Sequence, residues 1–110
     1  MSSWIQEFLP EALADMKRLD HATAVRVQKA IDRVAENPLP QSEGGYGKPL
    51  GNKQGLDLTG LLKVKLRSDG IRIVYKLERV HGTMRVVIVG VRTDMEVYRE
   101  ALRRRRRHGL

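Results

Sequence analysis

The sequence predicts an α+β domain of two layers: an N-terminal helical hairpin packed on an antiparallel β-meander, with a C-terminal helix closing the chain. Apolar residues recur at helical spacing up to residue 37, and from residue 61 the period changes to two. Helices followed by a run of strands favour the α+β class. The 110 residues, 41% of them hydrophobic, suit one compact domain, which we place at 1–110.

The first helix is predicted to begin at Pro10. Proline suits the first helical turn, where its missing N–H has no partner to lose. A short apolar stretch at residues 4–8 precedes it and is a candidate first strand. Three apolar residues of the helix share one face at i, i+4 and i+7, namely Leu9, Leu13 and Met16.

A second helix follows and ends at Asn37-Pro38, because the residue before a proline disfavours helical geometry. Its apolar residues repeat at i, i+3, i+4 and i+7: Val27, Ala30, Ile31 and Val34. Residues 38–60 are rich in glycine and proline, and we interpret them as a connecting loop. A phosphate-binding Walker loop is not indicated, since Gly47-Lys48 is followed by Pro49 instead of Ser or Thr.

Strands are predicted from residue 61 onward. Leu62, Val64 and Leu66 alternate with Lys63, Lys65 and Arg67, so the apolar set faces a core and the basic set faces away. A turn at 68–70 leads into a second alternating strand at 71–77. Residues 84–91 are rich in valine on both faces, which is typical of a central strand.

The final helix is expected to be capped by Asp94 and to pack through one side. The residues on that side are Met95, Tyr98 and Leu102. The chain ends in a basic tail at 103–110, in which residues 103–107 are all arginine.

The charge is concentrated in the second part of the chain. The 21 Lys and Arg outnumber the 13 Asp and Glu, for a net charge of +8. Residues 1–47 hold five basic and seven acidic residues, whereas residues 48–110 hold sixteen and six. Such asymmetry is typical of proteins that bind nucleic acids, because phosphates bound by Lys and Arg release counterions.

Composition also excludes several classes of protein. There is no cysteine, which rules out disulfides, a thiolate nucleophile and Cys-based metal sites. No apolar run reaches the ~20 residues of a membrane-spanning helix, and the N-terminus lacks a basic region followed by an apolar stretch. His21, His81 and His108 lack metal-ligand spacing. We therefore expect a cytoplasmic protein with no membrane partner, metal or cofactor.

The candidate site is a group of cations at strand ends. Lys63 and Lys65 lie on one strand face, and Arg72 returns on the paired strand. Arg92 ends the third strand shortly before Tyr98. The pattern predicts a polyanion site, the alternative being a solvated basic sheet face of the kind that protects edges.

These residues also carry a resemblance to a known family. GLLKVKLRSDGIRIVYKL at 60–77 and VVIVGVRTDMEVYREALRR at 86–104 closely resemble the RelE toxins of bacterial type II toxin–antitoxin modules. The specific parts are K-x-K-L-R-S-x-G-x-R-x-V-Y and V-G-x-R-x-x-x-E-V-Y, and the likeness spans nearly the whole chain. ParE toxins share the fold and a similar hairpin. The sequence departs from the family in two places. The Gly-rich loop at 44–55 is longer than in typical RelE toxins, and Leu50-Gly51-Asn52 replaces the arginine that these toxins often carry before the first strand of the meander.

The resemblance implies a ribosome-dependent mRNA endonuclease that cuts the codon in the A site. It assigns the active-site positions to Lys63, Lys65, Arg72, Arg92 and Tyr98. Arg67 and Arg85 are secondary candidates for RNA contact. The implied partners are a cognate antitoxin, the ribosome with mRNA in its A site, and operator DNA reached only through the antitoxin complex.

The expected chemistry needs no protein nucleophile, because the RNA 2′-OH attacks the neighbouring phosphate. Arg72 with Lys65 would offset the charge that develops on the phosphate oxygens. A neutral lysine, Lys63 or Lys65, would take the 2′-OH proton. Arg92 would stabilise the leaving oxygen or act as acid, and Tyr98 would stack on or orient a splayed base. Two alternatives are a ParE-like inhibitor of DNA gyrase and a nucleic-acid-binding domain without catalysis.

Overall fold

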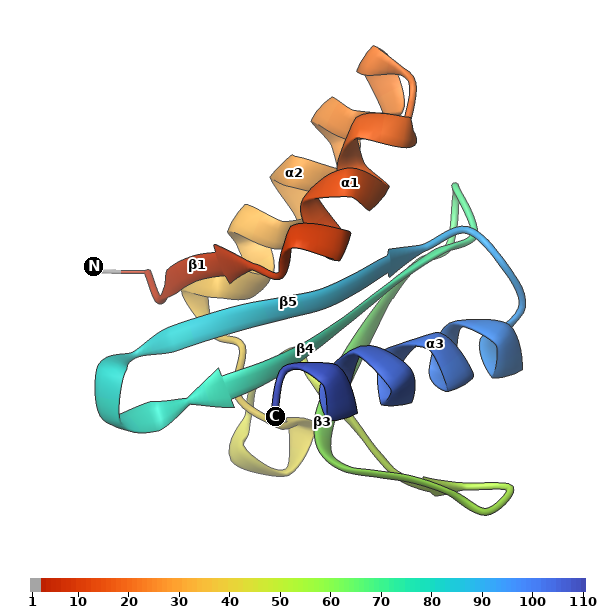
Figure 1. Ribbon diagram of the computed structural model, residues 1–110. Helices are drawn as coiled ribbons and strands as arrows, with labels where there is room; N and C mark the ends of the chain where they lie inside the picture. The colour runs from red at the N-terminus through yellow and green to blue at the C-terminus, as the bar shows by residue number, and fades with distance from the viewer. Residues whose placement is uncertain (1–2) are drawn as a thin grey trace.

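A five-stranded sheet, formed within residues 3–110, lies at the centre of the fold (Figure 1). The computed structural model describes residues 3–110, with the strand order β1-β5-β4-β3-β2. Strands β2 to β5 form an antiparallel meander, and β1 pairs in parallel with β5. The predicted α+β class and the candidate first strand are both confirmed. The strands are β1 (Ile5–Phe8), β2 (Lys48–Lys53), β3 (Leu56–Leu66), β4 (Ile71–Glu78) and β5 (Thr83–Gly90).

In the part of the chain that the structure describes, three α-helices cover the sheet from its two faces. The hairpin of α1 (Pro10–Arg18) and α2 (His21–Glu36) lies on one face, and α3 (Asp94–Arg107) lies across the opposite face (Figure 1). Short 3₁₀ turns occur at Gln41–Glu43 and Arg79–His81. The buried core gathers side chains from both helical layers and the strands between them, including Val27, Ile31, Ile73, Tyr75, Val86 and Val97.

The prediction of a connecting loop over residues 38–60 is wrong in its second half. Strand β2 begins at Lys48, and β3 begins at Leu56, five residues before the predicted strand. Gln54 and Gly55 join them with φ values of 51° and 84°, the double left-handed geometry of a tight hairpin turn. The glycines that suggested a loop thus form a hairpin, and the meander has four strands instead of three.

The predicted apolar face of α1 is wrong at its centre. Leu13 is 48% exposed, while Ala12 and Asp15 are the buried residues of this helix. The helix therefore turns a small residue and a carboxylate toward β5. In α2 the predicted face is confirmed at Val27, Ile31 and Val34, which are all buried, while Ala30 is half-buried.

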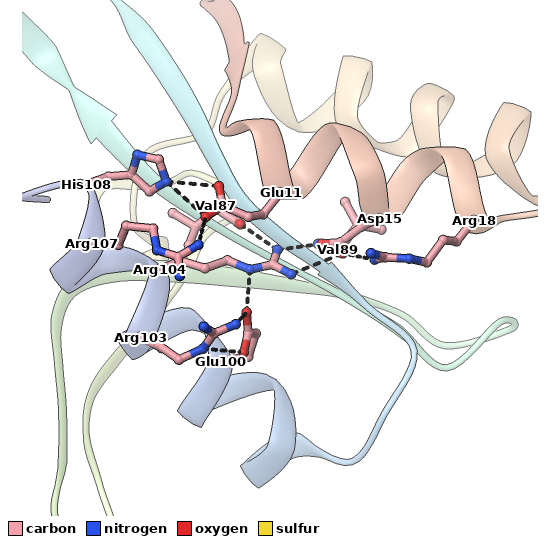
Figure 2. A network of polar contacts seen from close by, with 10 residues as sticks. All are labelled: Glu11, Asp15, Arg18, Val87, Val89, Glu100, Arg103, Arg104, Arg107 and His108. Carbon is pink, nitrogen blue, oxygen red and sulfur yellow. Dashed lines mark hydrogen bonds and ion pairs between the residues drawn. The ribbon is translucent and has the colours of Figure 1, made fainter.

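Asp15 and Arg104 form a buried ion pair at the edge of β5 (Figure 2). Strand β1 pairs only with residues 83–86, which leaves the backbone beyond Val86 without a strand partner on that side. There the Val89 N–H donates to Asp15 Oδ2 at 3.0 Å, and Arg104 Nη1 donates to the Val87 carbonyl at 3.1 Å. Arg104 Nη1 also lies 2.7 Å from Asp15 Oδ2, so a single pair closes this edge and joins α1 to α3.

The arginines at 103–107 form the last turns of α3, and several of them are paired. Arg103 binds Glu100, Arg107 binds Glu11, and His108 Nε2 lies 2.9 Å from Glu11 Oε1 (Figure 2). The basic run is thus partly a packing element of the fold. Among residues 3–110, no helix is long and apolar enough to cross a membrane.

Removing the arginine of the buried pair should destabilise the protein strongly. We expect Arg104→Ala to lower the free energy of unfolding by about 3–5 kcal/mol, because the buried Asp15 carboxylate loses its main cation. Arg106→Ala, an exposed change in the same helix, should stay within about 0.5 kcal/mol. Urea denaturation of the two variants tests this, and equal midpoints would show that the pair is not structural.

Candidate functional site

Strand register brings three predicted cations onto one face of the sheet. Lys65 on β3 lies directly opposite Arg72 on β4, and Arg72 lies opposite Gly90 on β5. Lys63 is two residues from Lys65, about 7 Å along the same face. This is the face that α3 covers, since Val97 packs against Gly90. The sheet thus gathers Lys63, Lys65 and Arg72 as the alternation predicted.

Arg72 is the most firmly held cation of this group. Its Nη1 donates to the carbonyls of Gly70 at 2.9 Å and Arg92 at 2.7 Å, which fixes the guanidinium between two turns. Its Nε pairs with the Asp94 carboxylate. The hydrogen bond from Arg72, with the nearby charges of the two lysines, lowers the pKa of Asp94 and keeps it ionised at neutral pH.

The prediction that Asp94 caps α3 is wrong. The residue at the cap position is Thr93, and Asp94 is the first residue of the helix proper. Its carboxylate is directed to Arg72 instead of the helix N–H groups. A negative charge in the first turn still suits the helix dipole, so one carboxylate serves both the helix and the cation group.

Tyr98 meets Lys63 beneath α3. Lys63 Nζ donates to the Tyr98 hydroxyl at 2.7 Å. The tyrosine is only 3% exposed, so a base cannot stack on its ring while α3 holds this position. In this arrangement the tyrosine orients Lys63, whereas the sequence suggested a stacking surface.

Lys65 and Arg92 are the accessible members of the group. Lys65 is exposed, and the Arg92 side chain is 77% exposed with Nη1 3.9 Å from Glu96 Oε2. An open depression of about 460 Å³ lies between Arg72 and Arg92 and is also lined by Thr93 and Glu96. A phosphate group can therefore approach Arg72 from the Arg92 side.

The two secondary candidates lie in different surroundings. Arg67 follows the last residue of β3 and is exposed near the Lys65 end of the site. Arg85 lies five residues before Gly90, about 17 Å along β5. It is bound by Glu7 and Glu78, so the structure does not bring it to the cation group.

Two residues of this region were not predicted as part of the site. Asp94 was expected to cap a helix, and only the three-dimensional contact reveals its partner. The sequence predicts a loop at Lys48, yet this residue pairs in register with Lys63. The alternation of Leu56 and Leu58 with polar residues was the sequence signal for that hairpin. Among residues 3–110, no group of three or more His, Asp or Glu is arranged to hold a metal ion.

Comparison with known proteins places these features in a family. The chain is 28% identical to the mRNA interferase toxin RelE of Escherichia coli K12 over 93% of its length and 97% of the relative. It is 31% identical to a putative RelE-like toxin protein of Escherichia coli, over 91% of its length and 95% of the relative.

A solved structure shows the same fold. It is a variant of E. coli toxin RelE in complex with an antitoxin RelB peptide, 26% identical, with a TM-score of 0.66 over 91% of this chain and 95% of that one. The family model described as the ParE toxin of the type II toxin–antitoxin system parDE matches residues 7–98. The chain therefore belongs to the RelE/ParE superfamily of type II toxin–antitoxin toxins.

Proposed function

We propose that this toxin is a ribosome-dependent mRNA endonuclease that cuts A-site codons. The observation that carries the proposal is the convergence of Lys63, Lys65 and Arg72 on one face of the sheet, beside an open depression. The likeness to a protein named mRNA interferase toxin supports it. Three clustered cations, of which Lys63 and Arg72 are held by hydrogen bonds, suit a reaction in which negative charge grows on a phosphate.

In the proposed reaction the RNA supplies its own nucleophile. The 2′-oxygen forms a bond to the adjacent phosphorus, the bond to the 5′-oxygen breaks, and the products carry a 2′,3′-cyclic phosphate and a 5′-hydroxyl. Arg72 binds the non-bridging oxygens, because its guanidinium is held in place before substrate arrives. Lys65, directly opposite on β3, adds a second positive charge.

Two proton transfers complete the proposed reaction. A neutral lysine, Lys63 or Lys65, takes the 2′-OH proton. Arg92 stabilises the leaving 5′-oxygen from the rim of the depression, and that oxygen takes its proton from Arg92 or from water to give the 5′-hydroxyl. A site made of lysines and arginines is a modest acid–base catalyst. The ribosome supplies the remaining rate enhancement, because it holds the codon in a reactive geometry and such positioning can accelerate a reaction by large factors.

The proposed partners follow from the same role. We infer a cognate antitoxin, since a related toxin is solved with an antitoxin peptide. The ribosome is the partner that presents mRNA, and operator DNA is reached only through the antitoxin complex. Action on ribosomes places the toxin in the cytoplasm.

Gyrase inhibition is the second candidate function. The family model that matches is that of the ParE toxins, which favours it. Inhibition by binding would require neither a base nor a fixed Arg72. The two functions are therefore separated by whether RNA is cut.

Primer extension on mRNA in a purified translation system tests the nuclease. Wild type should cut within A-site codons, and Lys65→Ala combined with Arg72→Ala should lower the cleavage rate by about 10²- to 10³-fold, because transition-state charge loses its partners. Lys53→Ala combined with Arg79→Ala removes the same number of cations away from the site and should cut like wild type.

The outcomes separate the candidates. Intact mRNA together with arrested growth would refute the nuclease and lead to a DNA gyrase supercoiling assay. RNA that is bound but never cut, with binding weakened in the double variant, would indicate a domain without catalysis.

Neutralising Asp94 should strengthen RNA binding. In the free toxin its carboxylate holds the guanidinium that we assign to phosphate, so Asp94→Asn removes an internal competitor. We expect tighter binding of a short single-stranded RNA and a salt slope steeper by up to about 0.7, the value for one phosphate contact. Fluorescence anisotropy measures both, with Glu43→Gln as a control that removes one carboxylate elsewhere.

The pair of Arg72 and Asp94 also predicts how RNA binding depends on pH. Because the pKa of Asp94 is lowered in the folded state, its pairing is present above the ordinary aspartate value and is lost only as the pH falls through the lowered one. The difference between wild type and Asp94→Asn should thus persist down to acidic pH. Weaker binding by Asp94→Asn would contradict the competition.

A further inference from the structure

Lys48 extends the cation group to the edge of the sheet. It is the first residue of β2 and lies directly opposite Lys63 on β3. Opposed residues of an antiparallel pair point to the same face, with Cβ atoms about 4.5–5.5 Å apart. Lys63 faces α3, because its Nζ contacts the Tyr98 hydroxyl. Lys48 therefore emerges on the same face, beside Lys63 and open to solvent.

No carboxylate of residues 3–110 forms an ion pair with Lys48, Lys63 or Lys65. The acid among them, Asp94, is engaged by Arg72. Like charges placed directly opposite each other on neighbouring strands repel. An anion bound between Lys48 and Lys63 would turn this repulsion into two attractive contacts.

The spacing of the cations fits a nucleic-acid strand. Lys63 and Lys65 are two residues apart along β3, about 7 Å, while Lys48 on β2 and Arg72 on β4 lie on opposite sides of that strand. With neighbouring strands about 4.8 Å apart, the centres of the two pairs are about 8–9 Å apart. That separation is comparable to one nucleotide of an extended single strand. Two phosphates joined by one nucleoside can therefore meet the two pairs in turn.

We propose that Lys48 and Lys63 bind the RNA phosphate next to the scissile one. Lys48 is a positioning residue in this scheme, since it touches a phosphate that does not react. The proposal rests on the proposed nuclease function and adds a second phosphate subsite to it. With Lys63 occupied by Tyr98 and this phosphate, Lys65 is left as the lysine that takes the 2′-OH proton. Taking the proton gives Lys65 its positive charge beside the scissile phosphate at the moment when negative charge grows there.

Phosphate-by-phosphate substitution tests the subsite. The probe is a short single-stranded RNA with a 2′-deoxy sugar at the cleavage position, which prevents cutting, and a neutral methylphosphonate at one linkage at a time. Binding of wild type, Lys48→Ala and Lys48→Arg is compared by fluorescence anisotropy. Lys53→Ala serves as a matched control, because it removes the same charge from the other end of β2.

We expect Lys48→Ala to weaken binding of the unmodified RNA by roughly three- to tenfold and to lower the salt slope by about 0.7, as for one lost phosphate contact. Lys48→Arg should restore most of the affinity, and Lys53→Ala should match wild type. The difference between wild type and Lys48→Ala should vanish when the methylphosphonate is next to the scissile linkage and persist when it is elsewhere. On programmed ribosomes Lys48→Ala should raise KM with kcat nearly unchanged.

Two results would overturn the subsite: equal binding by wild type and Lys48→Ala, or an equal loss at every methylphosphonate position, which would indicate general attraction only. A wild type that cuts mRNA while Lys48→Ala changes nothing refutes this proposal and leaves the nuclease standing. A wild type that cuts nothing refutes the nuclease. The phosphate subsite is then decided by the binding data alone: it exists only if the effect of Lys48→Ala disappears at one methylphosphonate position and persists at the others.

Discussion

The placement of α3 depends on the buried pair of Asp15 and Arg104. Strand β5 has a strand on both sides along its first half, whereas along its second half it pairs with β4 alone, because β1 has ended. An open edge there would expose backbone groups of a highly apolar strand. The pair binds one N–H and one carbonyl of this edge and at the same time ties α1 to α3 (Figure 2). Replacing either residue by an apolar one would leave the edge open.

The position of α3 in turn defines the cation group. The first turn of the helix carries Asp94 to Arg72, and the next carries Tyr98 to Lys63. On the other side of the sheet, Arg26 of α2 binds Asp69 in the turn between β3 and β4. The strands that carry Lys65 and Arg72 are thus held by α2 at the turn that joins them and by α3 on the face where the cations lie. Neighbouring positive charges repel, and these contacts keep the strands in place against the repulsion between their cations.

The sequence alone predicted the fold class, the helical hairpin, the strands from residue 61 and the convergence of Lys63, Lys65 and Arg72, because each rests on a simple periodicity. It missed β2 and the start of β3, since glycine in a hairpin turn looks like glycine in a loop. It also missed the burial of Asp15 and the partner of Asp94. Both are long-range contacts between a carboxylate and an arginine, and local spacing carries no information about them. The arginine run at 103–107 shows the same limit, because Arg104 is buried while its neighbours are at the surface.

A reaction in which RNA supplies the nucleophile asks little of a protein except fixed positive charge. A small domain can meet that demand, since strand register sets the separation of side chains without a dedicated loop. The proposed function also gives a role to Asp94. Four cations on one sheet face would bind any polyanion. In the function that we propose, the Asp94 carboxylate on Arg72 competes with such binding, and a correctly placed phosphate displaces it. On this proposal the cation group is selective through competition within the chain, and the substrate that competes best is one already held in position.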